Sequence, residues 1–326
     1  MTLRLHPIAA SLALLGASVA VALGAIELVL RLGPGLLSEE ARLRLSWPEQ
    51  RLSHADQAQD SWTFGFGVDD SVAWPRLLGD SLRPLEVRNL GLIGSGPEQY
   101  TRVLERFGLP LHPAVILYGV FPGNDLDDQE AFDRWARDGR RGNFAEWRIY
   151  GPAGRSPPLW ERSYLAVAIE EGWKFRHERF AGSTIRLRDG SPVELAPALL
   201  LPKAERSHRG DPAFNGALAA VDRARALAER AGSRLVVLVF PTKEEVYLPL
   251  RGERAPALTS RWVPALRELG VECLDLTETL RAHAGGGPLY FEVDGHANAA
   301  GNRVIAQAVQ RYLRARQAEL GLRLDR

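Results

Sequence analysis

Four short segments of the sequence combine residue types that together suit acyl transfer through a serine. They contain Asp60-Ser61 in QDSWTFGFGV, the glycines of NLGLIGSG, Asn124 in FPGNDL, and Asp294 with His296 in DGHANAAGNRVIA. Such chemistry needs a hydroxyl nucleophile, a base within hydrogen-bond reach, a carboxylate that orients the base, and N–H donors for the oxyanion. Each segment alone is typical of a turn or a helix cap. The indication therefore comes from finding all four in one chain.

The elements that would position these segments alternate between strands and helices. Short β-rich runs bounded by glycine, proline or charge predict four strands, at residues 85–90, 114–120, 234–240 and 271–276. Asp211-Pro212 predicts the start of a helix that ends at Gly232, and an apolar stripe from Val304 to Leu313 predicts another. This alternation predicts a parallel sheet with helices on both faces. Ligand-binding residues are then expected in the turns at the carboxyl ends of the strands.

The order and strand context of the four segments resemble the SGNH (GDSL-type) hydrolase family over roughly Asp60 to Leu313. The resemblance implies an α/β fold, namely a three-layer α/β/α sandwich around a central parallel sheet of the flavodoxin-like SGNH type. It implies a serine enzyme acting on ester bonds that needs no cofactor and no metal ion.

The same resemblance implies a role for each residue of the four segments. Ser61 would be the nucleophile, His296 its general base, and Asp294 the carboxylate that orients the imidazole. The oxyanion hole would consist of the backbone N–H groups of Ser61 and Gly94 and the side-chain amide of Asn124.

Three features depart from the family pattern. Gln59 stands where the family has a glycine before the Asp-Ser pair, and the strand expected at residues 51–58 (RLSHADQA) has little apolar character. Gly295 alone separates the aspartate from the histidine, where the commonest form of the family has two residues. This tighter spacing resembles SGNH-like proteins that acetylate cell-envelope polysaccharides, and also many bacterial esterases, so it favours neither class.

The N-terminus predicts a membrane anchor over residues 1–31. Its transmembrane helix would cover about 8–30, where Glu27 is the one charged residue. An alternative is a signal peptide cleaved after Ala20-Val21-Ala22. The basic residues around the segment favour a cytosolic C-terminal side, but long C-terminal domains translocate regardless of flanking charge. We expect a periplasmic, or otherwise extracytoplasmic, domain.

The rest of the chain divides into a linker at residues 32–50 and one SGNH domain at 51–322. Residues 125–212 lack long apolar runs and are rich in glycine, proline and arginine. They predict an irregular insertion over the active edge of the sheet. It holds half of the eight tryptophans, which either pack a small satellite core or line a substrate cleft: Trp135, Trp147, Trp160 and Trp173.

Composition and spacing argue against several other classes. A formal net charge of +1 supplies no basic surface for a nucleic acid. The single cysteine, Cys273, excludes an internal disulfide and a cysteine-rich zinc site, and its apolar neighbours predict an inert, buried thiol. The glycines of NLGLIGSG have the spacing G-x-x-G-x-G, which does not fit the dinucleotide fingerprint. The acidic residues near Asn124 lack a second histidine at ligand spacing, which argues against a metal hydrolase.

The sequence therefore predicts a membrane-anchored serine esterase that acts on short acyl esters. Its partners would be an acyl-ester substrate, with an acylated carbohydrate as one candidate, and the membrane. One alternative is an O-acyltransferase that acts on cell-envelope polysaccharide, in which a sugar hydroxyl replaces water as the acceptor. A second alternative is a non-catalytic binding module of the same fold, in which Ser61 is not activated.

Overall fold

The computed structural model describes residues 7–37, 45, 61–92, 94–139, 144, 147, 163–181, 183–292 and 294–323. Its central sheet is parallel and consists of β1 (Val115–Val120), β4 (Arg234–Val239) and β5 (Glu272–Asp275), in the order β1-β4-β5. These strands confirm three of the four predicted runs, because each lies within the predicted range. β1 and β4 are rich in β-branched and apolar residues, which suits strands that are covered on both faces, whereas β5 is partly buried and has a charged residue at each end.

The predicted strand at residues 85–90 is wrong for the described part of the chain. This segment lies outside regular secondary structure. Leu85 and Val87 pack partly buried against the core, whereas Glu86 and Arg88 form an ion pair on the outside. The alternation in sequence thus reflects one buried and one exposed face, but a strand also needs a hydrogen-bonded neighbour. The strand expected as that neighbour, at residues 51–58, lies outside the described residues.

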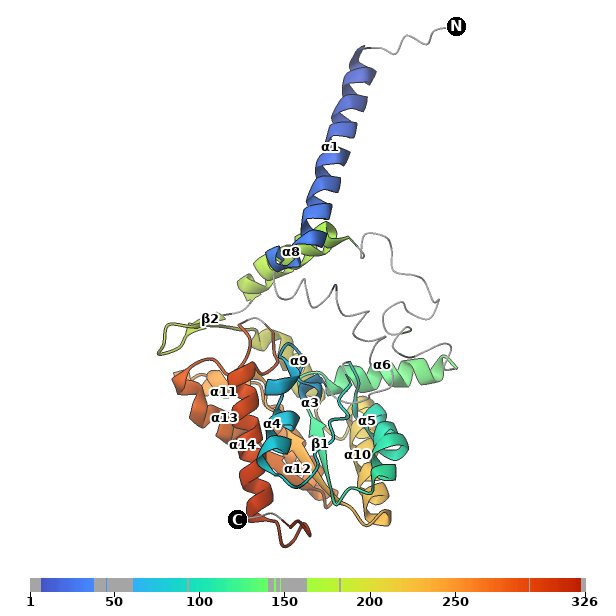
Figure 1. Ribbon diagram of the computed structural model, residues 1–326, viewed down its shortest axis with the longest axis vertical. Coiled ribbons are helices and arrows are strands. Elements are labelled where there is room, and N and C mark those ends of the chain that lie inside the picture. The colour runs from blue at the N-terminus through green and yellow to red at the C-terminus, as the bar shows by residue number, and fades with distance from the viewer. Residues whose placement is uncertain are drawn as a thin grey trace.

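Helices cover both faces of the sheet and form three layers (Figure 1). One face packs against α4 (Trp74–Ser81), α13 (Thr277–His283) and α14 (Ala299–Ala315). The other packs against α5 (Pro97–Val103), α10 (Pro212–Arg230) and α12 (Thr259–Glu268). Side chains of β4 alternate between the two cores, with Val236 and Leu238 on the first and Val237 and Val239 on the second. The predicted three-layer α/β/α fold is confirmed.

Both predicted helices are confirmed, and caps explain where they begin. The Asp211 side chain accepts hydrogen bonds from the backbone N–H groups of Ala213 and Phe214 at the start of α10. Asn298 caps α14 in the same way. These caps satisfy N–H groups that have no partner within the helix.

Much of the expected irregular insertion, namely residues 140–143, 145–146 and 148–162, lies outside the described residues, so its irregularity stays a prediction. The described part of residues 125–212 is largely regular. It contains α6 (Asp125–Arg137), α8 (Tyr164–Ala181), the antiparallel pair β2 (Ser183–Arg186) and β3 (Pro192–Leu195), and α9 (Pro197–Arg206). Trp135 and Trp147 pack around Phe132 and Phe144 in a satellite cluster. Trp173 is exposed on α8, and Trp160 lies outside the described residues.

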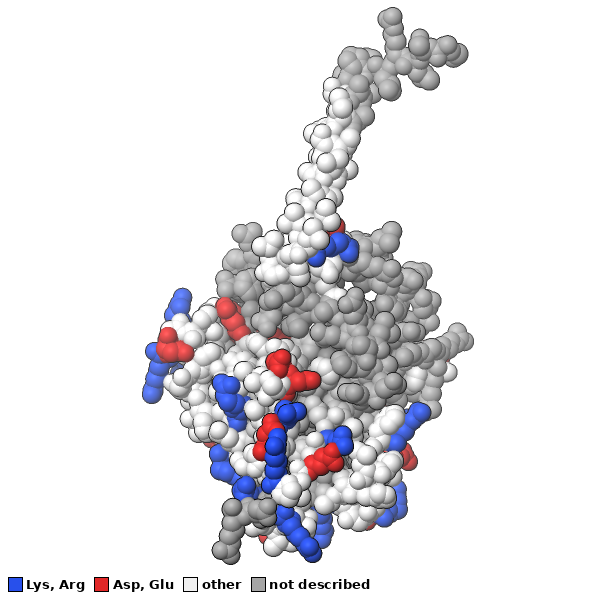
Figure 2. All heavy atoms as spheres, in the orientation of Figure 1, with Lys and Arg blue, Asp and Glu red and all other residues white. Residues whose placement is uncertain are grey.

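The N-terminal helix α1 (Pro7–Leu32) projects from the folded body (Figure 1). Its stretch Leu14–Leu32 is long and apolar enough to cross a membrane, a test that signal sequences also pass. Figure 2 shows the helix largely free of charged residues, whereas both signs of charge mix on the visible face of the body. The Glu27 carboxylate accepts hydrogen bonds from the backbone N–H groups of Tyr164 and Leu165 at the start of α8. This charge in the apolar helix therefore joins α1 to the insertion.

Shorter elements complete the chain. They are the helices α3 (Ser61–Phe64) and α11 (Lys243–Tyr247), a π-helix at Leu104–Gly108, and 3₁₀ turns at Pro34–Leu36, Asp70–Val72, Leu109–Leu111, Pro249–Arg251 and Ala284–Gly286. Burial raises the pKa of the Cys273 thiol in β5 to about 11. A thiol that stays protonated at neutral pH is a poor nucleophile, so the expectation of an inert cysteine agrees with its surroundings.

Candidate active site

Ser61 is the first residue of α3, and its neighbour Trp62 fixes the place of this short helix. The Trp62 side chain is 3% exposed. Its ring lies 5.0 Å from Phe121, which follows β1, 5.1 Å from Phe240, which follows β4, and 5.7 Å from Tyr290. These aromatic contacts hold α3 across the carboxyl ends of two neighbouring strands, where parallel sheets bind their ligands.

The glycine turn lies between α3 and α6, and two of its glycines permit this close approach. A Cβ atom on Gly91 would lie 2.3 Å from the backbone nitrogen of Phe64 in α3. A Cβ atom on Gly96 would lie 3.0 Å from both the Asp128 Cβ and the backbone nitrogen of Gln129 in α6. Gly94, between these two glycines in the sequence, has φ +70°. The turn thus contacts the helix that begins with Ser61 through Gly91 and the helix that follows Asn124 through Gly96.

Asn124 directly precedes α6, and a buried carboxylate orients its side chain. The Asn124 Nδ2 donates a hydrogen bond to Asp128 Oδ2 at 3.0 Å, and Asp128 is fully buried. An amide nitrogen carries two N–H groups, and within the described part of the chain the second has no acceptor. The Asn124 side chain therefore has one donor fixed and one donor to offer to a ligand.

The other acidic residues around Asn124 have structural partners. Asp125 is fully buried and accepts hydrogen bonds from the Phe121 backbone N–H and the Tyr100 hydroxyl. Asp127 forms an ion pair with Lys203 at 2.9 Å. These contacts account for the acidic run FPGNDLDD as the start of α6 and its supports.

Asp294 and His296 form the hydrogen-bonded pair that the family resemblance implies. Asp294 Oδ1 lies 2.6 Å from His296 Nδ1 and also accepts a hydrogen bond from the His296 backbone N–H at 2.7 Å. The imidazole ring lies 4.9 Å from the Phe66 ring and 6.0 Å from the Trp62 ring. Because the carboxylate occupies Nδ1, Nε2 is the nitrogen that would serve as base. Trp62 and Phe66 both belong to the segment that begins with Ser61, so the pair lies beside α3.

The electrostatics of the pair favour an ionised carboxylate. Burial by itself would raise the pKa of the Asp294 carboxyl. The opposing effects are larger and lower this pKa below its usual value: the neighbouring His296, the two hydrogen bonds that Asp294 accepts from His296, and the charge of Lys243. Asp294 is therefore charged at neutral pH, as a residue must be to stabilise an imidazolium.

Two residues at the site are not among those that sequence patterns identify. Trp62 packs against three of the turns that meet there. The Lys243 ammonium group donates hydrogen bonds to the backbone carbonyls of Glu292 and Asp294, each at 3.3 Å. Lysine is rare in this chain, since only three of its 41 basic residues are lysine and the rest are arginine. This rarity is the one feature of the sequence that points to Lys243.

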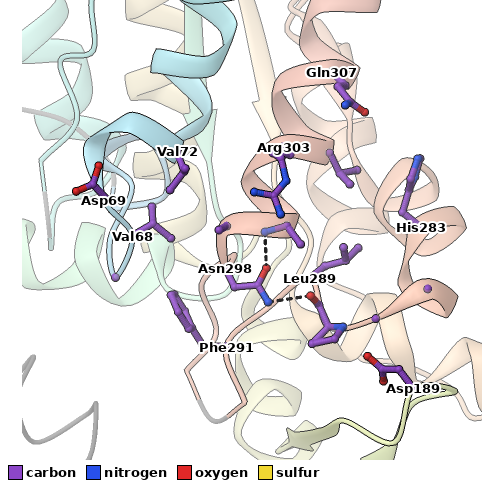
Figure 3. Close-up of a pocket in the computed structure, with 17 residues that line it drawn as sticks. Val68, Asp69, Val72, Asp189, His283, Leu289, Phe291, Asn298, Arg303 and Gln307 are labelled. Carbon is purple, nitrogen blue, oxygen red and sulfur yellow. Dashed lines mark hydrogen bonds between the residues drawn. The ribbon is translucent and has the colours of Figure 1, made fainter. Parts of the chain in front are cut away.

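An open groove of about 880 Å³ lies between the segment that follows Phe66 and α14 (Figure 3), and Ser61, Asn124, Asp294 and His296 are not among the residues that line it. Its near end contains Gly67, which follows Phe66, and Phe291, whose backbone N–H donates to the His296 carbonyl at 3.1 Å. Arg303 and Gln307 project into it from α14, and Asp69 lies across from them (Figure 3). A cleft with aromatic and planar polar groups beside a candidate base is suited to binding a small polar molecule.

All four predicted segments therefore meet at the carboxyl edge of the sheet. The structure places Trp62, next to Ser61, against Phe121 of the Asn124 segment and against the His296 ring, and Phe64 of the same helix against Gly91 of the glycine turn. Gln59 and Asp60 lie outside the described residues. Because Gln59 stands where the family has a glycine, we expect its side chain to strain the tight turn before Ser61, and this stays a prediction.

Comparison with known families agrees with this arrangement. Residues 200–323 match the family described as SGNH hydrolase-like domain, acetyltransferase AlgX. The matched region holds β4, β5 and the Asp294–His296 pair, whereas the segments of Ser61, Gly94 and Asn124 precede it. Residues 200–323 therefore match an SGNH hydrolase-like domain, which supports the family resemblance through the one motif inside the match, that of Asp294 and His296. A comparison with curated proteins finds no match.

We expect Asn124→Ala to lower kcat for p-nitrophenyl acetate by about 10²–10³-fold with little change in KM, because one oxyanion donor is lost. Steady-state kinetics measure both constants. Asn215→Ala, which removes an exposed asparagine on α10, is the matched control and should keep the wild-type kcat. A raised KM with an unchanged kcat would instead place Asn124 in ground-state binding.

Proposed function

We propose that this protein is an O-acyltransferase that moves a short acyl group, such as acetyl, through Ser61 to a carbohydrate hydroxyl. The observation that carries the proposal is the Asp294–His296 hydrogen bond of 2.6 Å, with its imidazole against the segment that begins with Ser61. The description of the matched family as an acetyltransferase supports transfer as the outcome. An esterase would use the same residues and differ only in taking water as the acceptor.

The first half of the proposed reaction loads the serine. Ser61 Oγ attacks the acyl carbonyl of the donor ester while His296 Nε2 takes the serine proton, and Asp294 stabilises the imidazolium that forms. The N–H groups of Ser61 and Gly94 and the Asn124 amide bind the oxyanion. The tetrahedral intermediate then expels the donor alkoxide, which takes the proton from His296 and leaves an acyl-serine.

The second half transfers the acyl group. An acceptor hydroxyl gives its proton to His296 Nε2 and attacks the acyl-serine carbonyl. The same three donors bind the second oxyanion, which collapses to release the new ester, and Ser61 Oγ recovers its proton from His296.

The groove beside the pair supports a carbohydrate as the acceptor. A sugar ring has an apolar face that packs on aromatic rings and hydroxyl groups that bond to planar polar side chains. In the groove, the ring of Phe291 would pack against the apolar face of the sugar. The side chains that would bind its hydroxyl groups are those of Asp69, Arg303 and Gln307. Arg303 has no ion-pair partner among the described residues, so its guanidinium group is available to a ligand.

The N-terminal helix supports a location at the membrane. With α1 retained as an anchor, the body would lie against the extracytoplasmic surface, where envelope polysaccharides are found. Cleavage of the helix would release the same domain on the same side.

The choice of acceptor is tested with the full chain in detergent, p-nitrophenyl acetate as donor and cellotetraose as acceptor. We expect acetylated tetrasaccharide by mass spectrometry, with the yield rising and free acetate falling as the saccharide concentration increases. Release of acetate without acetylated saccharide, at a rate that does not depend on the saccharide concentration, would assign esterase activity instead.

The same assay tests the groove. We expect Arg303→Ala to raise the saccharide concentration for half-maximal transfer by about tenfold, a typical effect of one lost charged hydrogen bond, without changing the donor reaction. The matched control is Arg311→Ala, which removes an exposed arginine from the same helix outside the groove. Equal effects of the two variants would remove the groove from the proposal.

A further inference from the structure

We propose that Lys243 is a positioning residue, whose buried ammonium group fixes the turn that carries Asp294 and His296. The inference rests on the proposed function, because it assigns a role within the same site. It concerns a residue that contacts neither the substrate nor the reacting atoms in the mechanism above.

Lys243 belongs to a run of three consecutive buried charged residues at the carboxyl end of β4. Lys243, Glu244 and Glu245 are each 5% exposed. The Glu245 carboxylate accepts hydrogen bonds from the backbone N–H groups of Thr259 and Thr242, and the Glu244 carboxylate accepts one from Ala196. Buried charges are costly unless they are paired or hydrogen-bonded. Through its hydrogen bonds, each of these three residues therefore connects a different segment of the chain to the end of β4.

Lys243 forms its hydrogen bonds with the turn that carries Asp294. Its Nζ lies 3.3 Å from the Glu292 carbonyl oxygen and 3.3 Å from the Asp294 carbonyl oxygen. The Glu292 carbonyl also accepts a hydrogen bond from the Glu194 backbone N–H in β3, at 2.9 Å. The turn is thus held by the ammonium group at the end of β4 and by the insertion through β3.

The use of lysine rather than arginine fits this geometry. A compact ammonium group with three donors can point at several carbonyls, whereas a guanidinium group is a planar fork that matches carboxylates. The chain has three lysines against 38 arginines. Lys203 has a similar contact, since its Nζ donates to the Gly123 carbonyl, next to Asn124, at 2.6 Å.

The Lys243 charge also acts on the catalytic pair. Among the described residues, the segments around Lys243 carry Asp294, His296 and Glu292 in the turn, Glu244 and Glu245 in α11, and Glu194 in β3, and its charge lowers the pKa of Asp294. A cation at this position stabilises the Asp294 carboxylate and disfavours the His296 imidazolium. Removing the cation should therefore make His296 easier to protonate, which raises its pKa.

The test is the NMR titration of the His296 imidazole in the full chain, assigned with the spectrum of His296→Ala. We expect Lys243→Met to raise the midpoint of the His296 titration by about half a unit or more, as loss of a nearby charge does. Lys243→Arg keeps the charge and should stay near the wild-type midpoint. The matched control is Lys203→Met, which removes a lysine that contacts Gly123 and Asp127, and it too should titrate like the wild type.

Activity supplies the second readout. We expect the acid limb of kcat/KM for Lys243→Met to move up in pH with the NMR midpoint, and the plateau to fall by about tenfold, from the loss of positioning. If Lys243→Met does not fold, Lys243→Gln keeps an N–H donor without the charge and replaces it in both measurements. An unmoved midpoint together with a plateau within twofold of wild type would overturn the proposal.

The two readouts separate this inference from the proposed function. A shifted NMR midpoint in a protein without turnover would leave Lys243 as the residue that positions the pair and would reject the acyl-transfer reaction. Normal turnover with no effect of Lys243→Met on either readout would keep the reaction and reject the role of Lys243.

Discussion

His296→Ala should lower kcat for p-nitrophenyl acetate by at least about 10⁴-fold, because removal of the base from a serine triad costs this much or more. In the proposed mechanism the imidazole takes the proton from Ser61, and the Asp294 hydrogen bond at Nδ1 leaves Nε2 for this task. Stability should change little, since the His296 side chain is only partly buried at 19% exposure.

The measurement pairs initial rates with a thermal melt of the same samples. The control is His208→Ala, which removes an exposed histidine that bonds only to a local backbone N–H and should keep full activity. A His296→Ala rate within tenfold of wild type, at an unchanged melting temperature, would show that ester turnover does not depend on this base.

Asp294→Asn should lower kcat by about 10³–10⁴-fold while leaving the fold intact, as amide replacement of a triad aspartate does. The amide keeps the shape of the side chain but removes the charge that stabilises the imidazolium. Loss of this anion also makes His296 harder to protonate, so the acid limb of kcat/KM should move to lower pH. This direction is opposite to that expected for Lys243→Met.

The pH profile of the residual activity of Asp294→Asn checks both effects. Asp80→Asn is the control, because Asp80 is an exposed partner of Arg76 and Arg83 and lies outside the site. A limb that moves to higher pH, or a kcat within a few-fold of wild type, would contradict the role of Asp294.

Local chemistry explains which parts of the fold the sequence predicts. The ranges of β1, β4 and β5 follow from apolar, β-branched runs between turn residues, and α10 and α14 follow from the caps Asp211 and Asn298. The same local reading fails at residues 85–90, because alternation reports which side chains are buried and not whether another strand pairs with the segment, and none pairs with it among the described residues.

The insertion shows a second limit of local patterns. Its hairpin and helices contact the site through single hydrogen bonds that no periodicity predicts. Lys203 in α9 bonds to Gly123 beside Asn124, and Glu194 in β3 bonds to Glu292 beside the Asp294 turn. The described part of the insertion thus supports two of the turns that hold the predicted site residues.

Residue types in four separated turns, together with the family resemblance, identify Ser61, Asn124, Asp294 and His296 as candidates. Their catalytic roles stay predictions, and the structure adds the Asp294–His296 hydrogen bond to them. Trp62 was not identified in this way, although it lies next to the serine, because its role depends on tertiary contacts with Phe121, Phe240 and Tyr290. Lys243 was missed for the same reason, since its partners are backbone carbonyls far away in sequence.

The most direct test of the account is fluorophosphonate labelling of the purified full chain, with the modified peptide mapped by mass spectrometry. These reagents trap a serine that a neighbouring base activates, whether water or a sugar later accepts the acyl group. The account predicts one adduct, on Ser61, that is absent from His296→Ala. No adduct on the folded protein, or an adduct on another serine, would contradict it and favour a binding module of the same fold.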